Sequence, residues 1–226
     1  MTRIALLPAG LILAVSLAIA QTPNSIQASG SATRNVNPDM AQLNVGVVTQ
    51  AATAQAAADQ NATTTAAVIK ALEGVLGTAG TIQTLYYSIS PRYVSTGGQQ
   101  TLAGYIVTNT LQVTTTVVGR VGPLIDAANQ AGANNISGPY YGLQNPDPEV
   151  QLALAAASKQ ALAHAAAIAS GLGAKTGAIV SAQEGSTARP FVSGDASAPT
   201  ASVATPIQTG TVSVSANVTV TVALVQ

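Results

Sequence analysis

The sequence predicts an α+β fold, in which a mostly antiparallel sheet of long strands is covered by helices on one face. Three observations lead to this prediction. Residues 211–225 alternate apolar and polar side chains without a break, which is typical of a half-buried strand. Residues 53–77 and 146–171 repeat apolar side chains at helical spacing. The elements follow the order ββα, ββα, βα, ββ, which lacks the series of βαβ units that a Rossmann fold requires.

The C-terminal strand sets the scale of the fold. At roughly 3.3 Å per residue it would extend about 50 Å, two to three times the usual strand length. It therefore needs long neighbours and a helical layer over its apolar face. We expect an inward face of Val214, Val218, Val220 and Val222 and an outward face that includes Thr219 and Thr221.

The first pair of alternating runs covers residues 26–31 and 41–47. Between them lies Asn37-Pro38-Asp39, whose residue types favour a turn, so these runs are predicted to form a β-hairpin. A helix should follow from the N-cap Thr53 to Gly77. Its predicted inward face consists of Ala58, Ala62, Thr65, Ile69, Leu72 and Leu76.

A second hairpin is predicted from residues 82–93 and 102–116, joined by the turn formers of residues 95–99. Its long second arm is the expected neighbour of the C-terminal strand. Residues 121–131 read as a short helix. Residues 135–143 read as a strand that Gly138-Pro139 interrupts, which favours a bulge or an edge position.

The longest helix is expected from Pro146 to Gly171, because proline and carboxylates both suit a first helical turn. Its predicted inward face consists of Leu154, Ser158, Ala161, Ala165, Ile168 and Leu172. A strand over residues 179–183 follows. Residues 185–205 consist largely of Ser, Ala, Pro, Thr and Gly without periodicity, so a mobile loop that proteases cut first is expected there.

Residues 1–20 resemble a secretory signal peptide, with Arg3, an apolar run and Ala18-Ile19-Ala20 as the cleavage site. An uncleaved anchor is less favoured, because Pro8 and Gly10 interrupt the apolar run. Without cysteine, neither a lipidated N-terminus nor a disulfide framework can form. We therefore expect residues 21–226 to be a single soluble, exported domain without a transmembrane span.

Charged residues make up 7% of the chain, with 8 basic and 8 acidic side chains. The average soluble domain has about 25%. No basic face is therefore expected to bind nucleic acid. A surface of Thr, Ser, Gln and Asn provides little charge repulsion between copies of the protein. The composition is therefore compatible with a homo-oligomer.

The sequence suggests no catalytic residue, cofactor or metal ligand set. His164 is the single histidine, and no nucleophile or acid accompanies it in the pattern, so a surface position is expected. Asp147 and Glu149 are explained by the dipole of the helix that they open. The glycines at 97–98 and 171–173 lack the strand-then-helix context of a phosphate loop and are interpreted as a turn and a helix cap.

The tyrosines leave two interpretations open. Packing in the core with a bonded hydroxyl is the ordinary one. The alternative is that Tyr86, Tyr93 and Tyr105, brought together by the second hairpin, form part of an interaction surface, where tyrosine is enriched. Alternation separates Tyr86 from Tyr87 and Tyr140 from Tyr141, so the core cannot hold all of them.

Short motifs follow one another over residues 26–225. They are Ile26-x-Ala28-x-Gly30, Pro38-Asp39-x-Ala41, Thr53-Ala54-x-Ala56, Pro91-x-Tyr93, Gly104-Tyr105, Asn109-x-Leu111-x-Val113, Val121-Gly122, Asp126, Gly132-Ala133 and Pro206-Ile207-x-x-Gly210. Together they resemble the SIMPL domain family of bacterial envelope proteins. The resemblance implies an exported α+β protein without established catalytic activity, associated with envelope integrity and stress tolerance, and it leaves an oligomeric state open.

One departure from the family pattern concerns the long helix, which in the family usually carries many Lys, Arg and Glu residues and here, beyond Asp147 in its first turn, keeps only Glu149, Lys159 and His164. The resemblance makes the leading hypothesis a non-enzymatic periplasmic protein that acts through self-association or through binding of envelope components, with secretion or outer-membrane association as open alternatives. The second hypothesis is a small-ligand or glycan-binding module, and a hydrolase is the least favoured.

Overall fold

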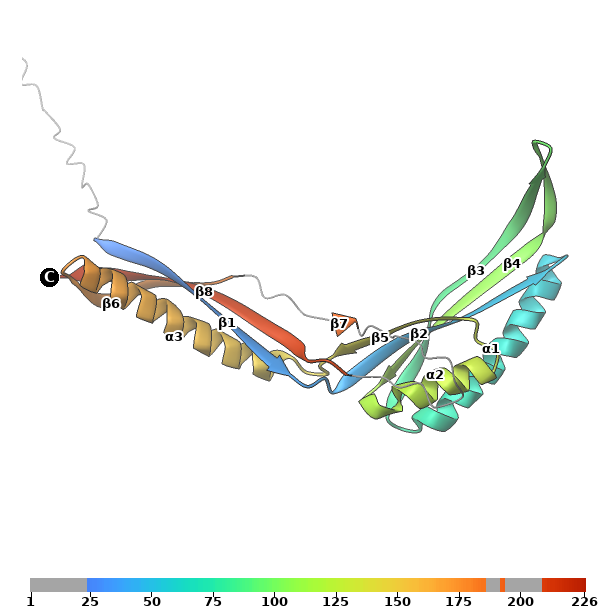
Figure 1. Ribbon diagram of the computed structural model, residues 1–226, viewed down its shortest axis with the longest axis horizontal. Coiled ribbons are helices and arrows are strands. Elements are labelled where there is room, and N and C mark those ends of the chain that lie inside the picture. Colours follow the sequence, from blue (N-terminus) through green and yellow to red (C-terminus); the bar gives the residue numbers. More distant parts are fainter. Residues whose placement is uncertain (1–23, 186–191, 194–208) are drawn as a thin grey trace, which may run out of the picture.

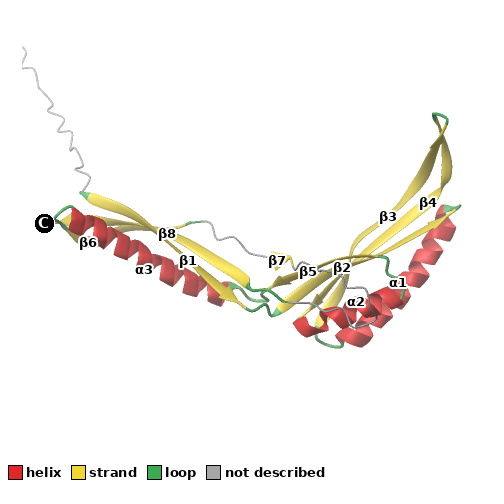
Figure 2. Ribbon diagram, viewed as in Figure 1, coloured by secondary structure: helices red, strands yellow, loops and turns green. Residues whose placement is uncertain are grey.

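The computed structural model describes residues 24–185, 192–193 and 209–226, which form two lobes placed end to end (Figure 1). Each lobe consists of an antiparallel sheet with helices on one side (Figure 2). The α+β class and the antiparallel pairing predicted from the sequence are confirmed. The element order is as predicted except for the short extra strand β7 at Val192–Ser193, and the strands form two sheets where one was expected. The assignment of residues 21–226 to a single domain stays a prediction.

The first lobe, called the alanine lobe here, contains three strands in the order β1-β8-β6 and the helix α3. Their bounds are β1 Ser25–Val36, β8 Val212–Val225, β6 Lys175–Glu184 and α3 Asp147–Gly171. β8 pairs with β1 along the whole length of β1, from Ser25↔Ala223 to Val36↔Val212. The predicted inward face of β8 is confirmed, because its even-numbered residues from Val212 to Val222 are buried.

The helix α3 packs on β1 and β8 through a stripe of alanines. The buried residues are Ala153, Ala157, Ala161, Ala165 and Ala169. The layers approach so closely that a Cβ added to Gly30 would lie 2.2 Å from the carbonyl oxygen of Ala157. Only small side chains fit such a gap. The predicted inward face was therefore wrong at Ile168 and Leu172, which are 44% and 67% exposed.

The second lobe, called the five-stranded lobe, has the strand order β3-β4-β2-β5-β7. The strands are β2 Met40–Ala51, β3 Gly80–Thr96, β4 Gln99–Thr115, β5 Asn135–Gly142 and β7 Val192–Ser193. Two helices, α1 Ala54–Leu76 and α2 Val121–Gln130, lie on one side of this sheet, and a short 3-10 turn, η1 Val118–Arg120, leads into α2 (Figure 1). As expected, β5 carries a bulge at Gly138-Pro139, where its register with β2 shifts.

Larger side chains fill the core of the five-stranded lobe. Leu43, Leu72, Leu111, Leu124 and Tyr141 are all at most 1% exposed. The N-cap prediction is confirmed, because the Thr53 hydroxyl accepts a hydrogen bond from the Ala56 amide at 3.2 Å. On α1 the buried face is Ala57, Asn61, Thr65, Val68, Leu72 and Leu76, so the predicted face is correct at three positions and displaced by one residue at the others.

Two predicted strand pairings were wrong. β1 and β2 do not form a hairpin, since β1 pairs with β8 and β2 pairs with β4 and β5. β4 is likewise not a neighbour of β8 and lies between β3 and β2. Turn-forming residues show where a chain bends but not which sheet the next strand joins. Here residues 37–39 pass from one lobe to the other.

The connection between the lobes is reinforced at Asp39. A second crossing, residues 143–146, leads from β5 to α3. The Asp39 Oδ1 accepts a hydrogen bond from the Gln144 backbone at 2.7 Å, and the Asp39 amide donates to the Gly142 carbonyl at 3.2 Å. These hydrogen bonds join the two connecting segments, residues 37–39 and 143–146. Asp39 therefore fixes the point at which both segments pass from one lobe to the other.

Two expectations lie largely outside the described residues. The signal peptide of residues 1–20 is one, and the loop of residues 185–205 is the other, except that Val192–Ser193 pair with β5 as β7. The helix α3 is long and apolar enough to cross a membrane by length and composition, which was not expected of any segment after residue 20. It nevertheless packs along β1 and β8, and the absence of a transmembrane span stays a prediction.

Candidate interaction surface on the projecting hairpin

The β3–β4 hairpin extends well beyond the rest of its sheet (Figure 1). β2 ends at Ala51, which pairs with Tyr105, whereas the β3–β4 ladder continues to Thr96↔Gln99. The far part of the hairpin therefore has no third strand beside it. Two-stranded ribbons bury little apolar surface, so both faces of this part are accessible.

One face of the hairpin is apolar, and we call it the aromatic face. Its residues are Tyr87, Ile89, Tyr93, Leu102 and Tyr105. The register fixes its orientation, because Ile89 lies opposite Val107, which is buried beneath α1. Tyr87, Ile89, Tyr93 and Leu102 are between 44% and 56% exposed, and Tyr105 is half-buried. The aromatic face therefore lies on the same side of the sheet as α1 and α2. It extends beyond the first residue of α1, so no described element covers it there.

The opposite face of β3 is polar and carries Tyr86, Ser88, Ser90 and Arg92. Of the tyrosines expected at an interaction surface, Tyr93 and Tyr105 lie on the aromatic face, whereas Tyr86 lies on the polar one. Tyr86 and Tyr93 are more than half exposed. The hairpin therefore brings together two of the three residues, and alternation excludes the third.

The sequence reasoning missed Tyr87, Ile89 and Leu102 as surface residues. Apolar alternation normally marks the buried side of a strand, and here it continues beyond the end of the neighbouring strand. The alternating run at residues 41–47 is much shorter than the run at residues 102–116, but this difference indicates a projection only once the two strands are known to pair, which the sequence does not show. A long strand beside a short one must project.

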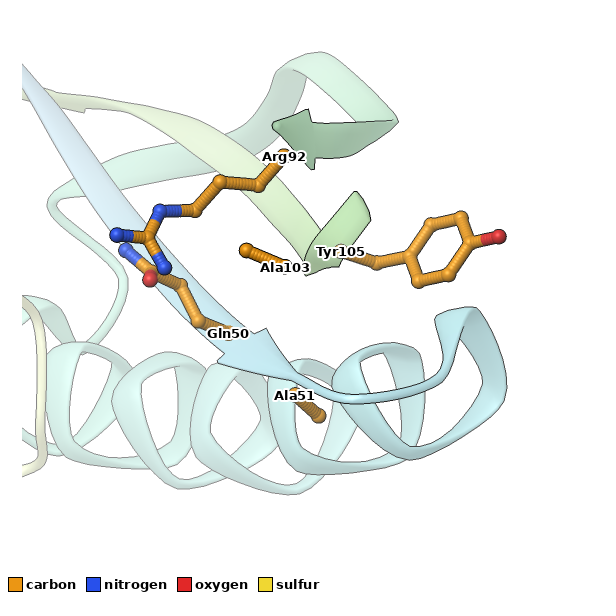
Figure 3. Close-up of a pocket in the computed structure, with 5 residues that line it drawn as sticks. All are labelled: Gln50, Ala51, Arg92, Ala103 and Tyr105. Carbon is orange, nitrogen blue, oxygen red and sulfur yellow. The ribbon is translucent and has the colours of Figure 1, made fainter. Parts of the chain in front are cut away.

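A hollow lies at the base of the hairpin, where β2 ends. It has a volume of about 210 Å³ and is lined by Gln50, Ala51, Arg92, Ala103 and Tyr105. The Arg92 and Gln50 side chains extend toward one another, while Tyr105 points away from both (Figure 3). Within the described part of the chain, Arg92 has no ion-pair partner. The hollow thus presents an unpaired guanidinium beside an amide.

The backbone around the hollow explains the direction of Arg92. The β3–β4 register skips Ala103, so Arg92 pairs with Gly104 and Tyr93 with Leu102. Gly104 has a φ of +131°, and a Cβ there would lie 2.5 Å from the Ala51 carbonyl oxygen. Glycine is needed at this close approach. Its missing side chain leaves room for Arg92 to cross toward β2.

A second, open hollow of about 450 Å³ lies where α3 ends and β6 begins. Among its lining residues only Lys175 has a charged side chain, and the others are Ala166, Ser170, Gly173, Ala174, Thr176 and Gln226. A single exposed ammonium without converging polar groups is a weak recognition site. This hollow therefore suggests no specific ligand.

Polar side chains of α3 bind β1 and so support the structure of the alanine lobe. His164 is exposed, as expected, and its Nδ1–H donates to the Ser29 carbonyl on the outer edge of β1 at 2.8 Å. One turn earlier, Gln160 accepts from the Ser31 amide at 2.7 Å. Glu149 pairs with Arg34 at 2.7 Å. The His164 and Gln160 side chains therefore occupy backbone groups that the edge strand β1 would otherwise leave free, whereas Glu149 binds the Arg34 side chain.

The described residues contain no group of three His, Asp or Glu side chains that could hold a metal ion. His164 is hydrogen-bonded to the backbone carbonyl of Ser29, which is not a nucleophile. Tyr141 is 1% exposed, and burial raises its pKa above the ordinary value near 10. Its hydroxyl has no hydrogen-bond partner within residues 24–185, 192–193 and 209–226. A buried neutral phenol of this kind belongs to a core.

The SIMPL family model, described as a protein of unknown function (DUF541), matches residues 26–222. The uncharacterized protein YggE of Escherichia coli strain K12 is 31% identical over 159 residues, which cover 69% of this chain and 63% of that protein. The 26 kDa periplasmic immunogenic protein of Brucella melitensis biotype 1 is 28% identical over 167 residues, covering 72% of this chain and 67% of that protein. The chain therefore spans less than two thirds of the E. coli relative.

Proposed function

Because the chain belongs to the SIMPL family, we propose that it is an exported, non-catalytic protein of the bacterial periplasm that acts by self-association and by binding other envelope components. A relative named as a periplasmic protein supports the compartment. The exposed aromatic face supports self-association, and it is the observation that carries the proposal. A contribution to envelope stress tolerance is part of the same proposal.

Export requires that residues 1–20 act as a cleaved signal peptide. Ala18-Ile19-Ala20 fits the small-residue pattern of a cleavage site. N-terminal sequencing of the protein from the cell envelope should read Gln21-Thr22-Pro23. Recovery of a chain that starts at Met1 from the membrane fraction would contradict cleavage.

The case for self-association rests on the chemistry of the aromatic face. Tyrosine and apolar side chains are enriched in the centres of protein interfaces, where they lose contact with water. Burying a fully exposed side chain of this size contributes about 1.5–3 kcal/mol, and Ile89 and Leu102, which are 44% and 51% exposed, can still gain roughly half of that in an interface. The face carries no charged side chain that would oppose a second copy. β3 is also the outermost strand of its sheet, so its free edge offers backbone groups for pairing.

The test compares two neighbouring substitutions of the mature protein by light scattering at several concentrations. Ile89→Asp places a charge on the aromatic face, whereas Ser90→Asp places the same charge on the opposite face. We expect a discrete oligomer for the wild type and for Ser90→Asp, and a monomer for Ile89→Asp. The far-UV spectrum should be the same for all three proteins. A monomeric wild type, or equal loss of the oligomer in both variants, would overturn this role of the face.

A further inference from the structure

The outward side of the five-stranded sheet carries ordered rows of uncharged polar side chains. This is the side opposite α1 and α2 (Figure 2). The register aligns residues from four strands, β3, β4, β2 and β5, in each row. The rows are Thr81–Thr114–Gln42–Tyr140, Gln83–Gln112–Asn44–Ser137 and Tyr86–Thr110–Gly46–Asn135.

These rows form a two-dimensional array of hydrogen-bonding groups. Strands lie about 4.8 Å apart, so a row of four spans about 14 Å. Each amide of Gln83, Gln112 and Asn44 offers both a donor and an acceptor, as a pair of neighbouring hydroxyls requires. Tyr86 is exposed at one corner of the array, and Tyr140 is half-buried at the opposite corner. Tyrosine rings supply flat apolar surfaces with a polar edge.

Asn44 shows that the array has unused bonding capacity. Its Oδ1 is buried and has no hydrogen-bond partner among the described residues. Buried polar atoms are nearly always paired, and an unpaired acceptor costs about 1–3 kcal/mol. The atom lies in the middle row, between Gln112 and Ser137. Because Oδ1 itself is buried while the residue is only half-buried, a ligand hydroxyl would pair with it only after the Asn44 amide turned outward.

Two further rows connect the array to the hollow at Arg92, and each of them contains one apolar residue, Val48 or Ile106. The next rows along the strands are Ser88–Thr108–Val48 and Ser90–Ile106–Gln50, followed by Arg92 opposite Gly104. Arg92 and Gln50 extend toward one another there (Figure 3). A guanidinium binds a carboxylate through two parallel hydrogen bonds. The array is therefore neutral along most of its length and has, at one end, a guanidinium that can bind an acidic group.

This combination points to one class of ligand. Nucleic acid requires several cations along its backbone, and this face offers one. A protein partner would favour an apolar centre, which the opposite face of the hairpin has. We infer that the outward face binds an extended glycan strand that bears carboxylate groups, with ring hydroxyls on the amide rows and one carboxylate on Arg92. The inference goes beyond self-association and uses the other face of the sheet.

The test titrates the mature protein with soluble peptidoglycan glycan strands whose peptide stems have been removed, so that the lactyl groups of the sugars carry free carboxylates. Chitin oligosaccharides of similar length serve as the neutral ligand. We expect wild type to bind the acidic strands about tenfold more tightly than the neutral ones, with an affinity that falls as salt is added. Arg92→Gln should remove this preference and the salt dependence. Gln112→Ala should weaken the binding of both ligands by about threefold to tenfold.

Two control variants show whether glycan binding depends on Arg92 specifically. One tests whether any exposed cation would serve, and the other tests whether binding requires self-association. Lys70→Gln removes an exposed cation from α1, on the other side of the sheet, and should change neither affinity. Ile89→Asp should keep glycan binding even where it abolishes self-association. The inference is overturned if wild type binds neither ligand, if Lys70→Gln weakens binding as much as Arg92→Gln, or if Gln112→Ala leaves both affinities unchanged.

Discussion

In the alanine lobe α3 meets its sheet through five alanines, whereas in the five-stranded lobe α1 and α2 meet theirs through leucines, valines and Tyr141. The first lobe buries little area per residue but brings its layers into backbone contact at Gly30. The second buries large side chains over a wider gap. Stability should therefore depend on close fit in the alanine lobe and on apolar area in the five-stranded lobe.

The largest effect is expected from a charge in the thin core of the alanine lobe. Val220 is 3% exposed on the helix side of β8, and Thr221 is half-exposed on the other side. Val220→Asp buries an unpaired carboxylate, so it should cost more than about 5 kcal/mol and give unfolded or insoluble protein. Thr221→Asp should cost less than about 1 kcal/mol in urea unfolding. Equal damage from both would show that the polar face of β8 is also covered, as in a subunit interface.

A smaller steric change tests the backbone contact itself. In Gly30→Ala the new methyl group would meet the Ala157 and Ala161 backbone at 2.2 and 2.4 Å, and no rotation can relieve this overlap. We expect a loss of about 3 kcal/mol in the free energy of unfolding, the upper end of the usual cost of overpacking. Gly74→Ala is the control, because Gly74 on α1 has open space around its Cα. It should stabilise by about 0.5–1 kcal/mol. A Gly30→Ala protein as stable as wild type would disprove the close approach.

In the five-stranded lobe, Tyr141→Phe removes a buried hydroxyl that has no partner among the described residues. The variant should be more stable by about 1 kcal/mol at neutral pH. The raised pKa of Tyr141 means that the folded state keeps the phenol proton while the unfolded state releases it above pH 10. Stability should therefore fall as the pH rises past 10 in wild type more steeply than in Tyr141→Phe. Parallel pH curves for the two proteins would show that the hydroxyl is solvated.

The smallest effect is expected at the edge of the alanine lobe. His164→Ala removes one exposed hydrogen bond to the Ser29 carbonyl, so the free energy of unfolding should change by no more than about 1 kcal/mol. Urea unfolding measures this change. The double variant Gln160→Ala, His164→Ala should instead increase aggregation at high concentration, because both uncover the edge of β1. A loss of several kcal/mol in the single variant would mean that His164 supports the core.

Local patterns predicted most elements of this fold. The alternation in β8, the N-cap at Thr53 and the start of α3 at Pro146 depend on neighbouring residues, and the structure confirms all three. Strand pairing depends on distant residues. Ser25 pairs with Ala223 at the other end of the chain, and no local signal at residues 25–51 shows that β1 and β2 belong to different sheets. The predicted hairpin failed for this reason.

The faces of α3 show a second limit. Period alone cannot choose between neighbouring stripes when most residues are alanine, and the prediction favoured the stripe with larger side chains. The close approach at Gly30 selects the smaller ones. The candidate surface was predicted in part, since Tyr93 and Tyr105 share a face. The array on the outward side of the sheet could not be predicted, because it requires the register of four strands.

Association through the aromatic face is tested most directly by hydrogen–deuterium exchange of the mature protein. Amides of residues 85–94 should exchange more slowly as the protein concentration increases, because a second copy covers the hairpin and its free edge. Ile89→Asp should abolish that protection, and Ser90→Asp should retain it. Concentration-dependent protection of α3 and β6, with unchanged exchange at residues 85–94, would contradict the account and place the interface on the alanine lobe.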